Sequence, residues 1–548
     1  MLSKLIGGKV YDPAQQLDGE IRDIFIRDGL IIQDPGSDAR FDQIHDVAGK
    51  VVMAGAVDIH SHIAGGNVNT ARLLLPEQHR NHLRRRINQP FSSAKWSTTD
   101  TGYRYARMGY TTVVEPAMLP VNALDVHLQM ADIPIIDTAA LAILGNDDLL
   151  LRLMRDRASQ SQINDYVAWT LHATRALGLK VINAGGANAF KSNVRQFDLD
   201  DIVPDYGVSS RQILQTLQRA THDLGVPHPV HVHCNNLGMP GNVETVLATM
   251  EAAQGLPMHL AHVQFYAYGK EGTRGFSSAA AQLMEGFRRY PNITMDVGQV
   301  LFGQTVTLSG DVIAQYSRHG DASPNKWVVW DAECEGSGGV VPYRYRQTSF
   351  VNGLQWAIGL EMFLLAEDPG RVFFTTDHPN GAPFTCYPQL FRLLMDYPYR
   401  LACLESIHPD VIPMTLLKDL KKEFSLYEIA LMTRSAAANL LGLHDRGHLM
   451  PGAIADIAVY SPNDNKEIMF DRAALVFKNG HLVVRDGDIV ERLSGKAQTI
   501  LPHYDLGIRQ TVQRHFDRFY SLSLQHFMVN EVDFVQSDQQ RFNSHDCL

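Results

Sequence analysis

Apolar, strand-like segments alternate with longer helical segments from residue 54 to about residue 430. The helical segments include residues 209–224 and 242–254. Repeated strand-then-helix units over ~375 residues predict an α/β fold with a parallel sheet, and this length suits a TIM-like (β/α)8 barrel with insertions. A doubly wound sheet is the alternative, but no GxGxxG or GxxxxGK[ST] motif follows a strand, which weakens its nucleotide-binding versions. The strand-like segments are residues 111–115, 135–137, 180–183, 230–234, 258–263, 293–297 and 372–377.

Short strands dominate both ends of the chain. Asp28-Gly29 and Asn479-Gly480 each separate two strand-like pieces, and both dipeptides are hairpin signals. We therefore expect the two ends to pair into one β module beside the barrel. The predicted domains are residues 1–53 and 431–500 for the β module, 54–430 for the barrel, and 501–548 for a C-terminal tail that contacts a partner protein.

The composition narrows the class of partner and the compartment. Hydrophobic residues make up 45% of the chain and charged residues 20%, as in soluble globular proteins. A net charge of −10 argues against a nucleic-acid surface. Neither a run of about 18 apolar residues nor a basic region with an apolar core after Met1 is present, so neither a membrane span nor a signal peptide is predicted. The 5 scattered cysteines, without a CxxC pair, suit a reducing cytoplasm.

Barrel enzymes carry their chemistry at the carboxyl ends of the strands, so the residues at these ends are the first candidates. At the first strand, Asp58, His60 and His62 would point to one face if the strand runs through them. Two imidazoles on one face can reach a common metal. The later strand ends carry Lys180, His231, His233, His259, His262 and Asp377.

Imidazoles together with a carboxylate suit Zn²⁺ or a similar divalent ion. His231 and His233 would share a face, whereas only one of His259 and His262 can point inward on a strand. Asp377 ends an apolar run, where an unpaired carboxylate is costly and a metal would compensate it. Taken singly, each strand histidine is more often a hydrogen-bonded core residue. Taken together in barrel order, these strand ends predict a metal site.

At these positions the chain resembles the amidohydrolase superfamily. The matching residues are Asp58-Ile59-His60-Ser61-His62, Lys180 at the fourth strand, His233 at the fifth, His262 at the sixth and Asp377 at the eighth. The resemblance implies a distorted (β/α)8 barrel with a composite β-sandwich module built from both chain ends. It also implies a binuclear centre of two divalent metal ions, and Zn²⁺ is the metal we expect there. In that centre His60, His62 and Asp377 hold one metal, His233 and His262 hold the other, and a carboxylated Lys180 bridges both.

Longer phrases resemble a narrower family. Residues 226–238, 295–300 and 375–381 look like the A subunits of formylmethanofuran dehydrogenases and of the related formyltransferase/hydrolase complexes of methylotrophic bacteria. This resemblance implies hydrolysis of N-formylmethanofuran to formate and methanofuran in one-carbon metabolism, with the other subunits of such a complex as partners. Metals lower the pKa of a water that attacks the formyl carbon. Asp377 would pass the proton of that water to the leaving nitrogen.

The positions of Asn235, Asn236 and Gln299 suggest hydrogen bonds to the substrate amide. Two other interpretations stay open: a cyclic-amide hydrolase of the dihydropyrimidinase or hydantoinase type with the same metal site, and a non-catalytic scaffold on the same fold. Loss of a ligand position would indicate the scaffold, and every ligand position is present. The sequence leaves open which metal is bound, and whether the partners form a formyltransferase complex or a tungsten or molybdenum dehydrogenase.

Overall fold

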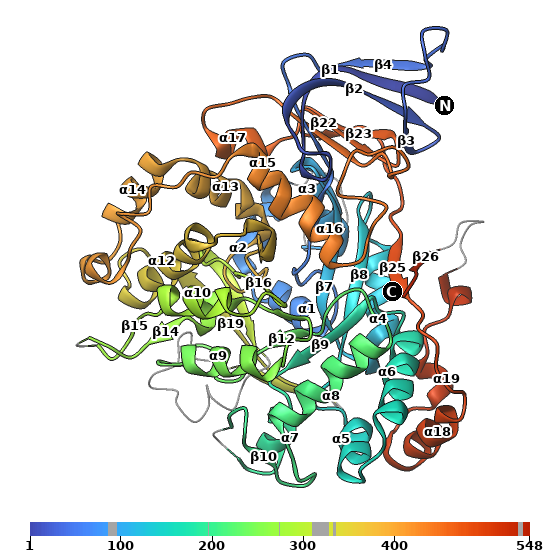
Figure 1. Ribbon diagram of the computed structural model, residues 1–548, viewed down its shortest axis with the longest axis vertical. Coiled ribbons are helices and arrows are strands. Elements are labelled where there is room, and N and C mark those ends of the chain that lie inside the picture. The colour runs from blue at the N-terminus through green and yellow to red at the C-terminus, as the bar shows by residue number, and fades with distance from the viewer. Residues whose placement is uncertain are drawn as a thin grey trace.

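A sheet of parallel strands curled into a barrel forms the centre of the molecule, and helices cover its outside (Figure 1). The computed structural model describes residues 1–85, 96–194, 197–272, 274–309, 328–332, 336–534 and 541–547. In chain order the barrel strands are β6 (Ala56–Asp58), β7 (Tyr110–Met118), β8 (Asp137–Ile143), β9 (Gly178–Ile182), β12 (His231–His233), β13 (Met258–Leu260), β16 (Ile293–Asp296) and β20 (Val372–Phe373).

Each barrel strand pairs in parallel with the next one in this order. The ring closes between its first and last strands, where Ser61 and His378 form a parallel bridge. The amide of His62 donates to the carbonyl oxygen of His378 there, at 2.9 Å. Helices on the outside and side chains on the inside bury both faces of the strands, which explains their apolar sequences. The prediction of a distorted (β/α)8 barrel is confirmed.

Helices follow the barrel strands as the sequence pattern predicts. The predicted helix 209–224 is observed as Ser210–Asp223, and the predicted helix 242–254 as Val243–Ala252. Ser209 and Gln212 form a capping box that sets the start of the first of these. The outer helices are α3 (Thr98–Arg107), α4 (Ala123–Ala131), α5 (Asp148–Arg155), α6 (Gln160–Thr174), α8 (Ser210–Asp223), α9 (Val243–Ala252), α10 (Ala280–Arg288), α12 (Phe350–Leu365), α13 (Tyr387–Met395), α14 (Tyr397–Glu405) and α16 (Ala436–Leu440).

An N-terminal segment, residues 2–54, and a segment near the C-terminus, residues 457–489, form one sheet above the barrel (Figure 1). Its central pairing joins β5 to β21, antiparallel, and so connects the N-terminal strands to the C-terminal ones. Both predicted hairpins are present; Asn479 and Gly480 have φ values of 50° and 76°, as a two-residue hairpin turn requires. The strands are β1 (Leu2–Asp12), β2 (Leu17–Arg27), β3 (Leu30–Ile32), β4 (Gln43–Asp46), β5 (Val51–Ala54), β21 (Ile457–Tyr460), β22 (Leu475–Lys478), β23 (His481–Arg485) and β24 (Asp488–Ile489).

Buried ion pairs tie this sheet to the barrel. The carboxylate of Asp137, at the start of β8, lies 2.6 Å from the guanidinium of Arg446 and 2.8 Å from the ammonium of Lys478. Lys478 also lies 2.6 Å from the carboxylate of Asp456. All these side chains are buried. Removing one partner would therefore leave the remaining buried charges only partly compensated.

The C-terminal segment packs against the barrel. Strand β25 (Ala497–Ile500) comes from the end of the segment predicted for the β module, yet it pairs in parallel with β8. Strand β26 (Phe542–His545) pairs with β25 in turn. Helices α18 (Ile508–Phe519) and α19 (Leu524–Phe527) lie beside α5 and α6 in Figure 1. The contact of this tail with a partner protein, and the domain boundaries, stay predictions.

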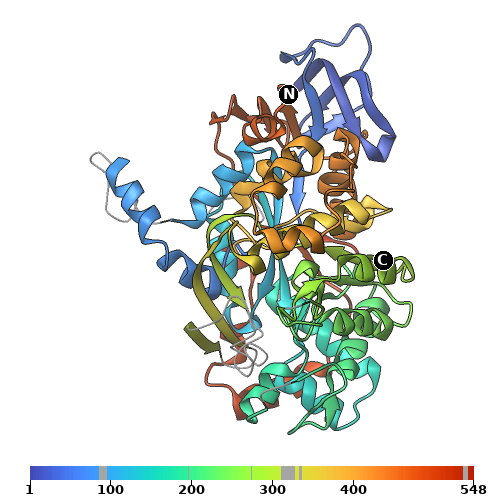
Figure 2. The ribbon, with the colours of Figure 1, turned by 90° about the vertical axis from the view of Figure 1, so that its left-hand side faces the viewer.

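A three-stranded arm extends from the barrel after β16. It consists of β17 (Gly303–Ser309), β18 (Val328–Ala332) and β19 (Gly336–Tyr345), all antiparallel. Helix α1 (Gly66–Leu73) packs on β17 and β19, and α2 (Pro76–Arg85) follows it at the side of the molecule (Figure 2). Of the helices in the described part of the chain, none has both the length and the apolar character that crossing a membrane requires. The described cysteines are all free, and Cys334 lies outside the described residues.

Candidate metal centre

The His-x-His segment lies just beyond the first barrel strand. Strand β6 ends at Asp58, so the predicted side-chain alternation of one continuous strand does not extend to His60 and His62. The buried carboxylate of Asp58 accepts hydrogen bonds from the hydroxyls of Tyr105, at 2.8 Å, and Tyr387, at 2.6 Å. Its other oxygen accepts from the amide of His60 at 3.0 Å. Asp58 therefore shapes the turn that presents the two histidines.

His60 and His62 converge on Asp377, which follows β20 on the other side of the barrel closure. Oδ1 of Asp377 lies 3.0 Å from Nε2 of His60 and 3.4 Å from Nε2 of His62. Asp377 has φ 50°, an uncommon value for a residue other than glycine. All three side chains are at least mostly buried. Residues far apart in sequence thus meet beyond the ends of the first and last strands, and their role as metal ligands stays a prediction.

The other ring nitrogens of these two histidines face carboxylates. Nδ1 of His60 lies 2.9 Å from Asp296, and Nδ1 of His62 lies 3.0 Å from Glu115. A carboxylate accepts only, so each Nδ1 carries the proton. In a neutral ring the Nε2 lone pair then faces an oxygen of Asp377, which is repulsive unless a cation lies between them. A divalent metal ion would provide that cation.

The charges around this half favour a cation. Burial opposes protonation of His62, but Glu115 and Asp377 outweigh it and raise the pKa of His62 to about 9. The pKa of His60 is also raised, because Asp296 and Asp377 outweigh the effect of burial. The same carboxylates that would charge these rings would stabilise a bound metal.

The second half of the predicted centre comes from β9, β12 and the end of β13. Lys180, His233 and His262 are buried, and among the described residues no hydrogen-bond partner is present for Lys180 Nζ, His233 Nε2 or His262 Nδ1. Burial lowers the pKa of Lys180 to about 8 and that of His262 to about 3, so the imidazole is neutral and able to bind a metal. Buried unpartnered polar atoms call for an explanation, and a metal centre supplies one.

Ligand atoms of His60, His262 and Asp377 all lie within 4.8 Å of one another. This triplet links the two predicted halves of the centre. His262 has φ 36°, and its backbone amide donates to Oδ1 of Asp296 at 2.7 Å. Gly298, with φ 66°, packs against it so closely that a Cβ there would lie 2.5 Å from Cβ of His262.

Asn380, in the loop after Asp377, contacts the carboxylate oxygen of Asp377 that does not face the histidines. Oδ2 of Asp377 accepts from Nδ2 of Asn380 at 2.9 Å, and Oδ1 of Asn380 accepts from the backbone amide of Leu308 in β17. The hydroxyl of Thr305, also in β17, donates to the carbonyl oxygen of Pro379. The arm therefore supports the loop that presents Asp377.

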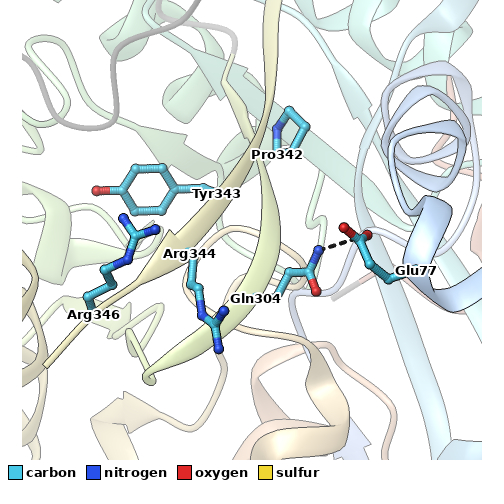
Figure 3. Close-up of a pocket in the computed structure, with 6 residues that line it drawn as sticks. All are labelled: Glu77, Gln304, Pro342, Tyr343, Arg344 and Arg346. Atoms are coloured by element: carbon cyan, nitrogen blue, oxygen red, sulfur yellow. Dashed lines mark hydrogen bonds between the residues drawn. The ribbon is translucent and has the colours of Figure 1, made fainter.

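A pocket of about 440 Å³ lies on the arm, and Figure 3 shows the residues around it. The side chain of Gln304 in β17 is exposed and lines this pocket. The next side chain, Thr305, is buried and contacts Pro379 in the loop that follows Asp377. The pocket and that loop therefore lie on opposite faces of one strand. The lining residues are Glu77, Gln304, Pro342, Tyr343, Arg344 and Arg346.

The predicted substrate-binding residues form hydrogen bonds within the protein. The amide of Asn235 donates to Asn183 at 2.8 Å, and that of Asn236 donates to Thr245 at 3.1 Å. Gln299 is buried and donates to the carbonyl oxygens of Val300 and Trp356. Their contact with a substrate stays a prediction.

Sequence reasoning missed three residues that orient the predicted ligands: Glu115, Asp296 and Asn380. Glu115 and Asp296 lie near the carboxyl ends of β7 and β16. Their position was a usable signal, because a buried acid at a strand end needs a partner. Asn380 gives no such signal, since its two partners come from separate elements.

Known proteins resemble this chain over its whole length. The amidohydrolase family model matches residues 43–491. The A subunit of the formyltransferase/hydrolase complex Fhc of Methylorubrum extorquens is 46% identical over 542 residues, which cover 98% of each chain. Protein FwdA of Methanocaldococcus jannaschii is 36% identical over 551 residues, covering 96% of each. A chain in the crystal structure of the formyltransferase/hydrolase complex from Methylorubrum extorquens with methylofuran has a TM-score of 0.94 at 46% identity, with 100% of both chains covered.

Proposed function

The chain belongs to the amidohydrolase family, and we propose that it is the A subunit of a formyltransferase/hydrolase complex, where it hydrolyses an N-formyl amine to formate and the free amine. The substrate we propose is N-formylmethanofuran or its methylofuran counterpart, since a homologous complex is described with methylofuran. One observation carries the chemical part of this proposal: the Nε2 atoms of His60 and His62 lie 3.0 Å and 3.4 Å from the same oxygen of Asp377 inside the barrel. The proposed partners are the other subunits of the complex.

The residues of the centre fit two divalent ions, most simply Zn²⁺. His60, His62 and Asp377 would hold one, and His233 and His262 the other. The donor set of neutral imidazoles and a carboxylate is the one that zinc favours. The unpartnered atoms in the second half, which lies directly against the first, support a second ion there.

Lys180 is the proposed bridge between the two ions, as a carbamate. Its neutral Nζ would attack carbon dioxide, forming the N–C bond as one C=O π bond opens and releasing one proton to water, which leaves a carbamate with two oxygens and one negative charge. Only the neutral amine can do this, and burial lowers the pKa of Lys180 to about 8. An unmodified Lys180 ammonium in this centre would repel both metals, which also favours the carbamate.

Bound metals would polarise the formyl oxygen and lower the pKa of the attacking water. Asp377 has one oxygen directed at His60 and His62 and the other held by Asn380. We propose that Asp377 accepts the proton of the water and delivers it to the leaving nitrogen. Asn380 can only donate through Nδ2, so it keeps the second oxygen of Asp377 in place as an acceptor. Asn235, Asn236 and Gln299 remain the proposed contacts to the amide.

The test uses the complex that contains this chain, with its metal content measured first. N-formylmethanofuran or N-formylmethylofuran is added and formate release is followed. We expect release with about two metals per chain, removal of activity by chelation, and recovery with Zn²⁺. Asp377→Asn should abolish release.

Asp147→Asn is the matched control, because Asp147 is equally buried and caps α5, a role that asparagine also fills. A metal-loaded complex that releases no formate but hydrolyses dihydrouracil or hydantoin would indicate the cyclic-amide hydrolase. A chain that binds no metal would indicate the scaffold.

A further inference from the structure

Three buried histidines form a hydrogen-bonded series that leads to the metal centre. Nδ1 of His228 lies 3.2 Å from the carbonyl oxygen of Leu440, on the outer side of the barrel wall. Nε2 of His228 lies 3.1 Å from Nδ1 of His231. Nε2 of His231 lies 3.1 Å from Nδ1 of His60. We call His228, His231 and His60 the histidine chain.

The carbonyl group of Leu440 determines the direction of every bond in the histidine chain. A carbonyl oxygen only accepts, so Nδ1 of His228 must donate to it. A neutral imidazole has one N–H, so Nε2 of His228 carries a lone pair and accepts from Nδ1 of His231. For the same reason, Nε2 of His231 accepts a hydrogen bond from Nδ1 of His60. When His60 is neutral, as a metal ligand must be, the last free atom of the series, Nε2 of His60, then has no proton.

Asp296 supports the same arrangement from a second side. Its Oδ2 lies 2.9 Å from Nδ1 of His60 and 3.2 Å from Nε2 of His259. Nδ1 of His259 lies 2.8 Å from the hydroxyl of Thr294, which can donate to it. Since a carboxylate only accepts, Asp296 requires the proton of His60 on Nδ1. The opposite tautomers would put two acceptors face to face at both Leu440 and Asp296.

We propose that His228 and His231 are positioning residues that, together with Asp296, keep Nε2 of His60 unprotonated and directed at the metal. This inference rests on the proposed function in one respect, namely that His60 binds a metal ion. Metal-binding histidines generally have their other ring nitrogen fixed in this way, and losing such a partner lowers metal affinity by about 10–100-fold. Here the fixing partner is a series of side chains that starts at a backbone carbonyl, well outside the ligand shell.

The first experiment measures Zn²⁺ affinity of the full-length protein by competition with a chromophoric chelator. His228→Phe removes the acceptor for His231, and we expect Zn²⁺ affinity to fall by about tenfold or more. His228→Gln keeps an acceptor in its amide oxygen, so its affinity should stay close to that of the parent. His127→Phe is the matched control, because His127 is also fully buried and donates to a carbonyl oxygen, that of Thr174.

Parent-like affinity in His228→Phe, or equal losses in the Phe and Gln variants, would overturn the proposal. A second measurement does not depend on any variant folding. Selective ¹⁵N labelling of the histidines reports which ring nitrogen carries the proton, and we expect Nδ1–H in His228, His231 and His60. A proton on Nε2 of His231, or on Nε2 of His60 in the Zn²⁺-loaded protein, would refute the proposal. If the parent binds no Zn²⁺ but shows these tautomers, the proposed function fails while the tautomer series stands.

Discussion

Gly298 determines how closely the loop after β16 approaches the predicted metal ligand His262, and Gly298→Ala tests that approach. An added Cβ would lie 2.5 Å from Cβ and 2.8 Å from Cα of His262, and 3.5 Å from Cβ of Asp377. Ordinary van der Waals contact begins at 3.4 Å, so His262 would have to move by about 0.9 Å. The obstacle is backbone and Cβ, which cannot rotate away.

A displacement of this size should disrupt the centre without unfolding the protein. Misplacement of a reacting group by about 1 Å can cost about 10²-fold in rate. We expect Gly298→Ala to lower formate release by that order and to weaken Zn²⁺ binding in the half that contains His262. The positive φ of 66° adds a conformational cost of about 1–2 kcal/mol.

Gly207→Ala separates these two effects. Gly207 also has φ 66°, but no atom lies within 4 Å of the position of its Cβ. It should show the conformational cost in thermal unfolding, with parent-like metal content and activity. Metal content, chelator competition and formate release are measured for both variants. If Gly298→Ala behaves like Gly207→Ala in all three, the close packing against His262 is not what holds the centre together.

Two further predictions concern Asp377 and the buried ion pairs. Asn380→Ala removes the hydrogen bond to Oδ2 of Asp377, which is worth about 1.5–3 kcal/mol for a charged acceptor. The kcat for formate release should therefore fall about 10–100-fold while the Zn²⁺ content stays unchanged. Loss of metal instead would contradict a purely orienting role for Asn380. Asp137→Asn should lower the thermal midpoint, because buried Lys478 and Arg446 each lose one carboxylate partner and keep only Asp456 and Asp445, respectively. The loss should stay below the about 3–5 kcal/mol of a fully broken buried pair. Burial alone would raise the pKa of Asp137, but Lys478 and Arg446 outweigh it and hold that pKa below its usual range. This stabilisation is present above the unfolded pKa of about 3.9 and is lost as the pH falls below it, so the variant should show a flatter loss of stability in acid.

The sequence located most of the proposed ligands because barrel chemistry follows strand order. His60, Lys180, His233 and Asp377 lie in or just after apolar segments, and parallel strands bring their carboxyl ends to one edge. The hairpin at Asn479-Gly480 was equally predictable from the sequence, since the backbone preferences of these two residues determine the turn conformation. Both the apolar strand segments and the hairpin turn are determined by residues that are neighbours in the sequence.

The pairing partner of strand β25 could not be predicted from the sequence. Residues 497–500 lie at the end of the segment that was predicted for the β module, but their partner is β8, more than 350 residues earlier. A strand pattern predicts an extended segment and says nothing about which edge it joins. Only the packed molecule selects that edge.

By itself, the sequence determined the fold class, the order of the strand ends and the residue types that meet there. The tertiary structure decided which nitrogen of each histidine faces the centre. That choice depends on Asp296, Glu115 and the carbonyl group of Leu440, each distant in sequence from the ring it orients. A histidine has two chemically similar nitrogens, so its role follows from the hydrogen bond at the other one, and that bond exists only once the barrel has closed.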